Sequence, residues 1–128
     1  MKPLTPEWIK RAEGDWSCVR LFADTRQNGP PYDVCFYAKQ CAENYLKAYL
    51  QEASVRFNKV HDLTALLDLA LPTAPDWNTL RPALDVLNPY TMEIRYPGYY
   101  ITGENAEEAY KLCEEVRAVV RISLGLSV

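Results

Sequence analysis

The residues DVCFYAKQCAENYLKAYLQE, from Asp33 to Glu52, form the most informative segment of the chain. Most of them are apolar, and the polar ones fall in a narrow strip in which Lys39, Glu43 and Lys47 follow at intervals of four. Residues spaced in this way share one face of an α-helix. A helix that is apolar around most of its circumference must be covered on several sides. The segment therefore predicts the central helix of a bundle, with its polar strip turned towards a groove, a partner or a cleft.

Four further segments carry apolar residues at helical spacing. They run from about Thr5 to Asp24, Asp62 to Leu71, Asp76 to Leu87 and Asn105 to Leu124. Thr5 is the expected N-cap, followed by Pro6. The segment from Asp76 to Leu87 contains Pro82 and is interrupted by Asn88-Pro89-Tyr90, which predicts a helix with a kink or a break. No segment alternates with period two for long, so no strand is predicted. The sequence predicts an all-α, antiparallel, up-and-down bundle of four to five helices: four long ones plus one or two short ones.

The length and composition are typical of one globular domain. The chain has 128 residues, 48% hydrophobic and 24% charged, so we expect a single domain over residues 1–128. We see no apolar run long enough for a membrane span and no signal-peptide pattern, which favours a cytoplasmic protein without a membrane partner. The net charge of −3 excludes a uniformly basic nucleic-acid-binding protein but leaves room for a local cationic site.

The cysteines and the single histidine do not predict a metal site. Cys18, Cys35, Cys41 and Cys113 include no Cys-x-x-Cys pair, and His61 is the only histidine. Tetrahedral zinc needs close nitrogen and sulfur ligands at short paired spacings. We therefore expect buried, reduced thiols and no metal or other cofactor.

The polar strip of Lys39, Glu43 and Lys47, with Gln40 beside it, has two interpretations. It is either a ladder of ion pairs on a solvated face, worth about 0.3–0.5 kcal/mol per pair, or a cationic rail. In the second case the lysines receive phosphate oxygens while Glu43 holds them in place. The apolar surroundings argue against a freely solvated face, and both interpretations stay open.

His61 stands just before the helical segment that begins near Asp62. Either residue is expected to cap that helix, or His61 packs as an ordinary side chain. Histidine is also the residue type that exchanges protons near neutral pH. His61 is therefore the candidate for any proton transfer by an imidazole.

Arg95 is followed by Tyr96, Pro97 and Gly98, and the Pro-Gly pair predicts a turn. An arginine fork suits phosphate, and Tyr96 or Tyr100 could stack on a base. Alternatively, these aromatic residues pack over the end of the bundle or form a dimer interface, where tyrosine and arginine are common.

Four motifs, in order along the chain, resemble the HEPN family of small helical domains that bind or act on nucleotides. The motifs are Trp8, Ala12 and Asp15; Phe36 to Ala48 (FYAKQCAENYLKA); His61-Asp62-Leu63; and Arg95-Tyr96-Pro97. The second motif is similar to the family's signature, an aromatic residue followed by Gln-x-x-Glu-x-x-x-Lys-Ala. The resemblance spans nearly the whole chain. It implies an antiparallel bundle of four to five helices that commonly pairs as a homodimer. It also implies a minimal nucleotidyltransferase as partner and, for some members, a toxin–antitoxin module.

Some HEPN toxins are metal-independent ribonucleases whose site has an arginine followed, after four to six residues, by a histidine. Arg95 stands at the matching place, but the residues from Tyr100 to Gly103 include no histidine. Arg56 and His61 have a fitting spacing but precede the third helical segment, which is the wrong place for this motif.

Three functions follow as hypotheses. The first is a non-catalytic domain that binds a nucleotide or RNA and works with a nucleotidyltransferase. The alternative is an endoribonuclease. The third is an interaction protein whose lysine strip is buried in an interface and neutralised by Glu43. The candidate ligand-binding residues are Lys39, Gln40, Glu43, Lys47, Tyr96 and Tyr100, and the candidate catalytic residues are His61 and Arg95.

Overall fold

The structure, a computed structural model, describes residues 1–24 and 31–128. Within these ranges it contains helices and no strand, so the prediction of an all-α fold is confirmed. The elements are α1 (Thr5–Phe22), α2 (Pro31–Glu52), α3 (Leu63–Ala70), the 3-10 helix η2 (Pro75–Leu80), α4 (Arg81–Leu87), the 3-10 helix η3 (Met92–Arg95) and α5 (Gly103–Ser123).

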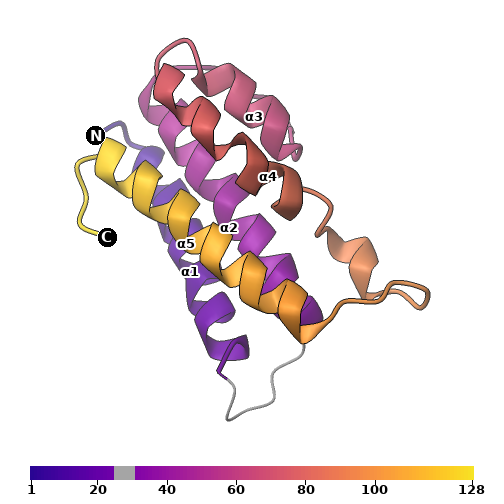
Figure 1. Cartoon of the computed structure of the whole chain (residues 1–128). Helices are drawn as coiled ribbons and strands as arrows, with labels where there is room; N and C mark the ends of the chain where they lie inside the picture. Colours follow the sequence, from indigo (N-terminus) through magenta and orange to yellow (C-terminus); the bar gives the residue numbers. More distant parts are fainter. Residues whose placement is uncertain (25–30) are drawn as a thin grey trace.

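Helix α2 is the centre of the bundle, as its apolar circumference predicted. It packs against α1 and α5 along its length and against α3 and α4 towards its C-terminal end (Figure 1). Its fully buried side chains include Tyr45, Leu46 and Leu50, and the buried thiols of Cys41 and Cys113 lie in the same core. Each helix covers a different side of α2, which is why so few of its residues reach solvent.

Three helices are long, where the sequence predicted four. Helices α1, α2 and α5 have 18, 22 and 21 residues, whereas α3 and α4 have 8 and 7. The segment predicted as a helix with a kink or a break divides after Leu80 into η2 and α4. Pro82 explains the division, because it lacks an amide hydrogen and is tolerated only in the first turn of a helix.

The start of α1 differs from the prediction. Leu4, not Thr5, is the N-cap residue, and its side chain makes no capping hydrogen bond. The hydroxyl of Thr5, which is fully buried, instead donates to Glu52 Oε1 at 2.9 Å. Thr5 therefore ties the beginning of α1 to the end of α2.

Two other helices have capping side chains. Asp62 caps α3, as one of the two residues predicted for that role, and accepts from the amides of Thr64 and Ala65 at 2.9 and 3.3 Å. Thr102 and Asn105 form a capping box at the start of α5, a feature that the sequence analysis did not identify. The two caps fix where the connections before α3 and α5 end.

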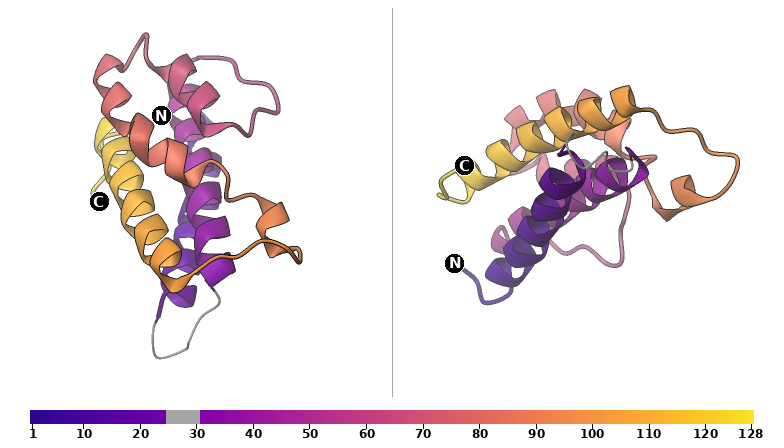
Figure 2. Two further views of the ribbon diagram at one scale, coloured as in Figure 1. Left: turned by 45° about the vertical axis from the view of Figure 1, so that its right-hand side comes forward. Right: turned by 90° about the horizontal axis from the view of Figure 1, so that it is seen from below.

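The connection of residues 53–62, which we call the return loop, runs back along α2 and projects from the bundle (Figure 2). It leaves α2 through a Schellman turn, in which the Val55 amide donates to the Leu50 carbonyl at 2.9 Å and the Ser54 amide to the Gln51 carbonyl at 3.2 Å. Ser54 has a φ of 60°, in the left-handed region. By His61 the loop has reached Lys39, nearer the middle of α2.

Replacing Ser54 by glycine is expected to raise the free energy of unfolding by about 0.5–1 kcal/mol, because glycine adopts a positive φ without strain. Urea denaturation measures the change. Ser54→Ala is the matched control: it also removes the hydroxyl that accepts from Lys2 Nζ, but keeps the Cβ. A glycine variant no more stable than the alanine variant would contradict the expectation.

No helix in the described ranges has both the length and the apolar character that crossing a membrane requires.

Candidate functional site

Lys39, Glu43 and Lys47 form a buried ion-pair cluster on α2. Lys39 Nζ lies 2.6 Å from Glu43 Oε1, and Lys47 Nζ lies 2.9 Å from Glu43 Oε2. The three residues are only 5%, 3% and 5% exposed. The ladder read from the spacing is therefore present, but it is covered by protein and not solvated. Both lysines donate a hydrogen bond to the carboxylate of Glu43.

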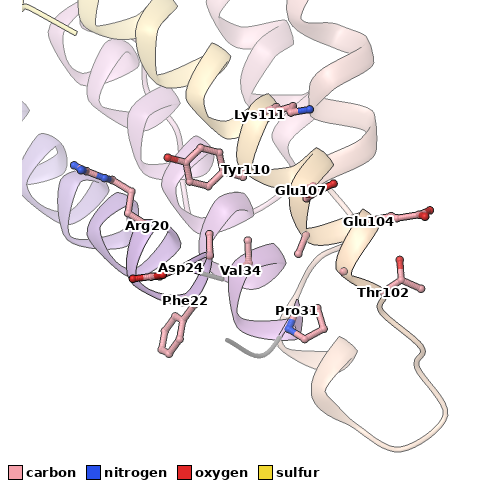
Figure 3. A pocket seen from close by; sticks show the side chains of 13 residues that line it. Arg20, Phe22, Asp24, Pro31, Val34, Thr102, Glu104, Glu107, Tyr110 and Lys111 are labelled. Carbon is pink, nitrogen blue, oxygen red and sulfur yellow. The ribbon is translucent and has the colours of Figure 1, made fainter. Parts of the chain in front are cut away.

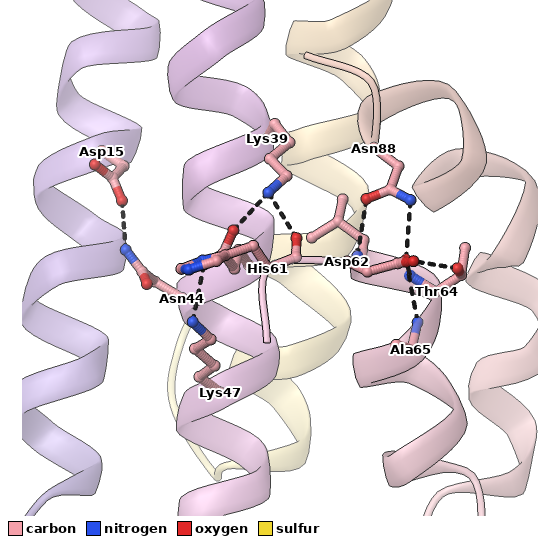
Figure 4. Close-up of polar contacts among 11 residues, drawn as sticks. Asp15, Lys39, Asn44, Lys47, His61, Asp62, Thr64, Ala65 and Asn88 are labelled. Carbon is pink, nitrogen blue, oxygen red and sulfur yellow. Dashed lines mark hydrogen bonds and ion pairs between the residues drawn. The ribbon is translucent and has the colours of Figure 1, made fainter. Parts of the chain in front are cut away.

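His61 joins this cluster from the return loop (Figure 4). Its Nδ1 lies 2.9 Å from Glu43 Oε2, and its carbonyl oxygen accepts from Lys39 Nζ at 2.7 Å. Because an ionised carboxylate only accepts, Nδ1 carries the proton in this contact. The side chain is 72% exposed, so the other ring nitrogen remains open to solvent or a ligand.

Glu43 is the ionised centre of the cluster. Burial acts to raise its pKa, but the hydrogen bonds from Lys39, Lys47 and His61 outweigh that effect and hold the pKa below its ordinary value. Two ammonium groups and one carboxylate leave a net charge of +1 when His61 is neutral. The cluster is therefore a weakly cationic region inside an acidic protein.

Asp15 and Asn44 extend the polar region to α1. Asn44 Nδ2 donates to Asp15 Oδ2 at 2.8 Å, across the contact of α1 with α2. Burial raises the pKa of Asp15 to about 6, with a further rise from the nearby charge of Glu43, while the bond from Asn44 acts to lower it. Asp15 is thus an acid whose proton is exchanged close to neutral pH.

Replacing Asp15 by asparagine is expected to stabilise the protein at pH 7–8. The pKa of Asp15 is about 6 in the folded protein and 3.8 ordinarily. Between these two pH values the folded state binds more protons than the unfolded state, so the wild type loses stability as the pH rises from about 4 to 6. Asparagine still accepts from Asn44 and carries no charge. The expected gain is on the order of 1 kcal/mol, since Asp15 is only partly shielded from water.

Thermal unfolding between pH 4 and pH 8 checks this expectation. The wild-type curve should decline between about pH 4 and pH 6, and the Asp15→Asn curve should lack that decline. A variant that is destabilised at pH 8 would show that the ionised carboxylate is needed for the fold.

Arg95 lies in η3, further towards the N-terminal end of α2. It donates to Asp33, and its guanidinium carbon lies 4.7 Å from the centroid of the Phe36 ring. Phe36 precedes Glu43 by seven residues, or about 10 Å along the helix. Arg95 is therefore fixed on α2 at a distance from the His61 cluster, and no contact joins the two in the described part of the chain.

The segment that follows Arg95 projects from the bundle as an arm (Figure 2). Tyr96 and Tyr100 are 60% and 86% exposed, and the predicted Pro-Gly turn is present, with Gly98 at a φ of 102°. Both tyrosines follow Arg95 closely in the sequence, and no contact joins either of them to Lys39 or Lys47 in the described part of the chain. The structure divides the predicted site into two parts: the cluster with half-buried Gln40 beside it, and Arg95 with its tyrosines.

A second ionic network, which the sequence analysis missed, joins α1, α2 and α5. Arg117 donates twice to Glu13, with both distances 2.8 Å, and Tyr45 OH also donates to Glu13. Arg121 Nη1 donates to Tyr45 OH at 3.0 Å. The spacing of Arg117 and Arg121 on one face of α5 was the available signal. Since Glu13 occupies these groups, the network is structural.

A separate cavity lies where α1 ends and α2 and α5 begin (Figure 3). Its volume is about 1070 Å³, and none of the predicted site residues lines it. Among the described residues that line it, the charged ones are Arg20, Asp24, Glu104, Glu107 and Lys111.

The model of the HEPN domain family matches residues 5–123. The match begins with the first residue of α1 and ends with the last residue of α5, so it includes the whole bundle. No curated protein and no solved structure matches the chain.

Proposed function

Because the chain belongs to the HEPN domain family, we propose that it binds a nucleotide or an RNA strand as a non-catalytic domain. Family membership supports a function related to nucleotides or RNA. The proposal adds that phosphate and base are recognised on the side of α2 from which the return loop and the arm project.

The observation that carries the proposal is the setting of Arg95. Asp33 holds the guanidinium of Arg95 over Phe36, and the Arg95 side chain is still 39% exposed. A preorganised arginine loses little freedom when its fork binds a phosphate. Tyr96 and Tyr100, on the arm beside it, offer ring faces on which bases can stack. The combination fits a phosphate flanked by bases.

The buried cluster has a supporting role in this proposal. Lys39 and Lys47 hold Glu43, and Lys39 with Glu43 holds His61, so the ligand meets the exposed imidazole of His61 and not the lysine side chains. Gln40 lies on α2 between this imidazole and Arg95. The net positive charge of the cluster adds a weak attraction for a phosphate that lies above it.

Replacing Arg95 by alanine is expected to weaken the binding of a short single-stranded RNA about tenfold, the loss of one charge-assisted contact of about 1.5 kcal/mol. Fluorescence anisotropy of labelled RNA at low salt measures the affinity. Arg81→Ala is the matched control, since Arg81 also pairs with an aspartate, Asp68, at 2.6 Å. Equal affinities of the two variants would contradict the proposed role of Arg95.

The alternative, a metal-independent endoribonuclease, has one observation in its favour. Glu43 fixes Nδ1 of His61, and the exposed ring leaves the other nitrogen free for proton transfer. Gel analysis of RNA incubated with the wild type and with His61→Ala distinguishes the two functions. Cleavage by the wild type that is lost in His61→Ala would establish the ribonuclease. RNA that stays uncut with the wild type would support the non-catalytic binding domain.

The proposed setting is a toxin–antitoxin-like module in which a homodimer of this chain acts with a minimal nucleotidyltransferase. The resemblance of the four sequence motifs supports this setting. Light scattering after size-exclusion chromatography, on the chain alone and mixed with a nucleotidyltransferase encoded beside it, tests both associations. A monomer that stays monomeric in the mixture would contradict them.

A further inference from the structure

A second hollow lies near the C-terminal end of α2, between the start of α1 and the return loop. Its volume is about 500 Å³, within the range of small-molecule sites, about 300–1000 Å³. Its lining residues are Lys2, Leu4, Trp8, Gln51, Ser54, Val55, Arg56, Phe57 and Asn58. All of them lie in described ranges, and none belongs to the site proposed above.

Two aromatic rings form part of its wall. Trp8 and Phe57 meet edge to face with ring centroids 5.6 Å apart. Trp8 is half-buried, whereas Trp16 and Trp77 are 6% and 5% exposed. Trp8 is therefore the tryptophan of this chain whose ring a ligand can reach.

The charged residues that line this hollow are positive. Lys2 and Arg56 line it, and no aspartate or glutamate is among the lining residues. Two further cations lie near the Trp8 ring, and both have a carboxylate partner. Lys47 Nζ, paired with Glu43, lies 5.4 Å from the ring centroid, and the guanidinium carbon of Arg11, paired with Glu7, lies 5.9 Å from it. The nearby carboxylate of Glu52 lies outside the lining and accepts from the Lys2 amide and from Thr5. In a chain of net charge −3, a lining with two cations and no carboxylate favours an anion.

We infer that this hollow binds one nucleotide, with the base against Trp8 and Phe57 and the phosphate at Arg56 and Lys2. A flat aromatic ligand matches the two rings, and the arginine fork matches the phosphate oxygens. The inference rests on the proposed function and names a second place at which the same chemistry is recognised. The ligand is either a free nucleotide or one nucleotide of a strand.

Titration of the full chain with adenosine monophosphate, followed by tryptophan fluorescence, tests the inference. A base that stacks against Trp8 should change the tryptophan emission. The change can be assigned to Trp8 because the other two tryptophans are buried. Arg56→Ala should weaken this binding about fivefold to tenfold. Lys59→Ala is the matched control, because Lys59 is an exposed cation of the same loop outside the lining. Trp8→Phe should abolish the signal while calorimetry still detects binding.

The Arg95→Ala variant separates this inference from the proposed function. Its adenosine monophosphate titration should match that of the wild type, although its RNA affinity is reduced. RNA binding that depends on Arg95, without any nucleotide response at Trp8, would overturn the inference and leave the proposed function intact. Absence of binding to any RNA or nucleotide would overturn both.

A short single-stranded oligoadenylate distinguishes the two sources of the ligand. If it binds with at least tenfold higher affinity than the mononucleotide, and this binding depends on both Arg56 and Arg95, the hollow takes a nucleotide of a strand. If the two affinities are equal and only Arg56 matters, the hollow takes the free nucleotide. Equal responses of Arg56→Ala and Lys59→Ala to both probes would contradict either assignment.

Discussion

Replacing Glu43 by alanine is expected to lower the free energy of unfolding by about 3–5 kcal/mol, because it leaves Lys39 and Lys47 buried without a counter-charge. Both ammonium groups are within 2.9 Å of this carboxylate, and both side chains are only 6% exposed. The loss is a large part of the about 5–15 kcal/mol that stabilises a typical domain. His61 also loses the partner of its ring.

Urea denaturation at pH 7 measures this loss. Glu114→Ala is the matched control: Glu114 is an exposed glutamate of α5, and its replacement should change the stability by less than about 0.5 kcal/mol. A Glu43→Ala variant within that same limit would mean that the two lysines reach water by a local rearrangement, and that the cluster contributes nothing to the fold.

The pH dependence gives an independent check on Glu43. Burial acts to raise its pKa, but the hydrogen bonds from Lys39, Lys47 and His61 bring it below the ordinary 4.5. A carboxylate with a depressed folded pKa stabilises the protein fully above its unfolded pKa, and this stabilisation is lost as the pH falls through the folded value. The difference between wild type and Glu43→Ala should therefore shrink below about pH 4.5, opposite in direction to the effect expected for Asp15.

The part of this cluster that the sequence could predict is the part that lies on one helix. Intervals of four residues place Lys39, Glu43 and Lys47 on one face, and the apolar residues around them indicate burial. The contact between His61 and Glu43 depends on how far the return loop runs back along α2, which local patterns do not encode. The same holds for Arg95, because its contact with Asp33 and Phe36 joins segments more than fifty residues apart.

Local energetics explains the remaining differences. Pro82 predicted a break because the chemistry of proline acts within one helical turn. Thr5 was expected to cap α1, but its hydroxyl donates to Glu52, which the fold brings close and which local sequence does not reveal. The contacts that were predicted therefore have partners within about one turn, and those with a partner from another element were not predicted. A partner within one turn was not sufficient, since the capping box of Thr102 and Asn105 was missed.

The cluster of Lys39, Glu43 and Lys47 is a costly way to fill a helix face, since well-packed apolar residues commonly replace such groups at no loss, or with a gain of about 1–4 kcal/mol. The triple variant Lys39→Met/Glu43→Leu/Lys47→Met should therefore recover the stability that Glu43→Ala loses and equal or exceed the wild type. Methionine also suits the contact that Lys47 makes with the ring of Trp8.

The same variant is expected to bind RNA at least tenfold more weakly, although it is stable, because the return loop loses both of its bonds from His61 to α2. Denaturation and RNA anisotropy on one preparation measure the two effects together. The single variant His61→Ala, which keeps the cluster, should lose only the contact of the imidazole with the ligand. A stable triple variant with wild-type affinity would show that these charges serve the fold alone. A stable variant with impaired binding would mean that the charges are retained because they hold His61 and the return loop in position, against the cost of burying them.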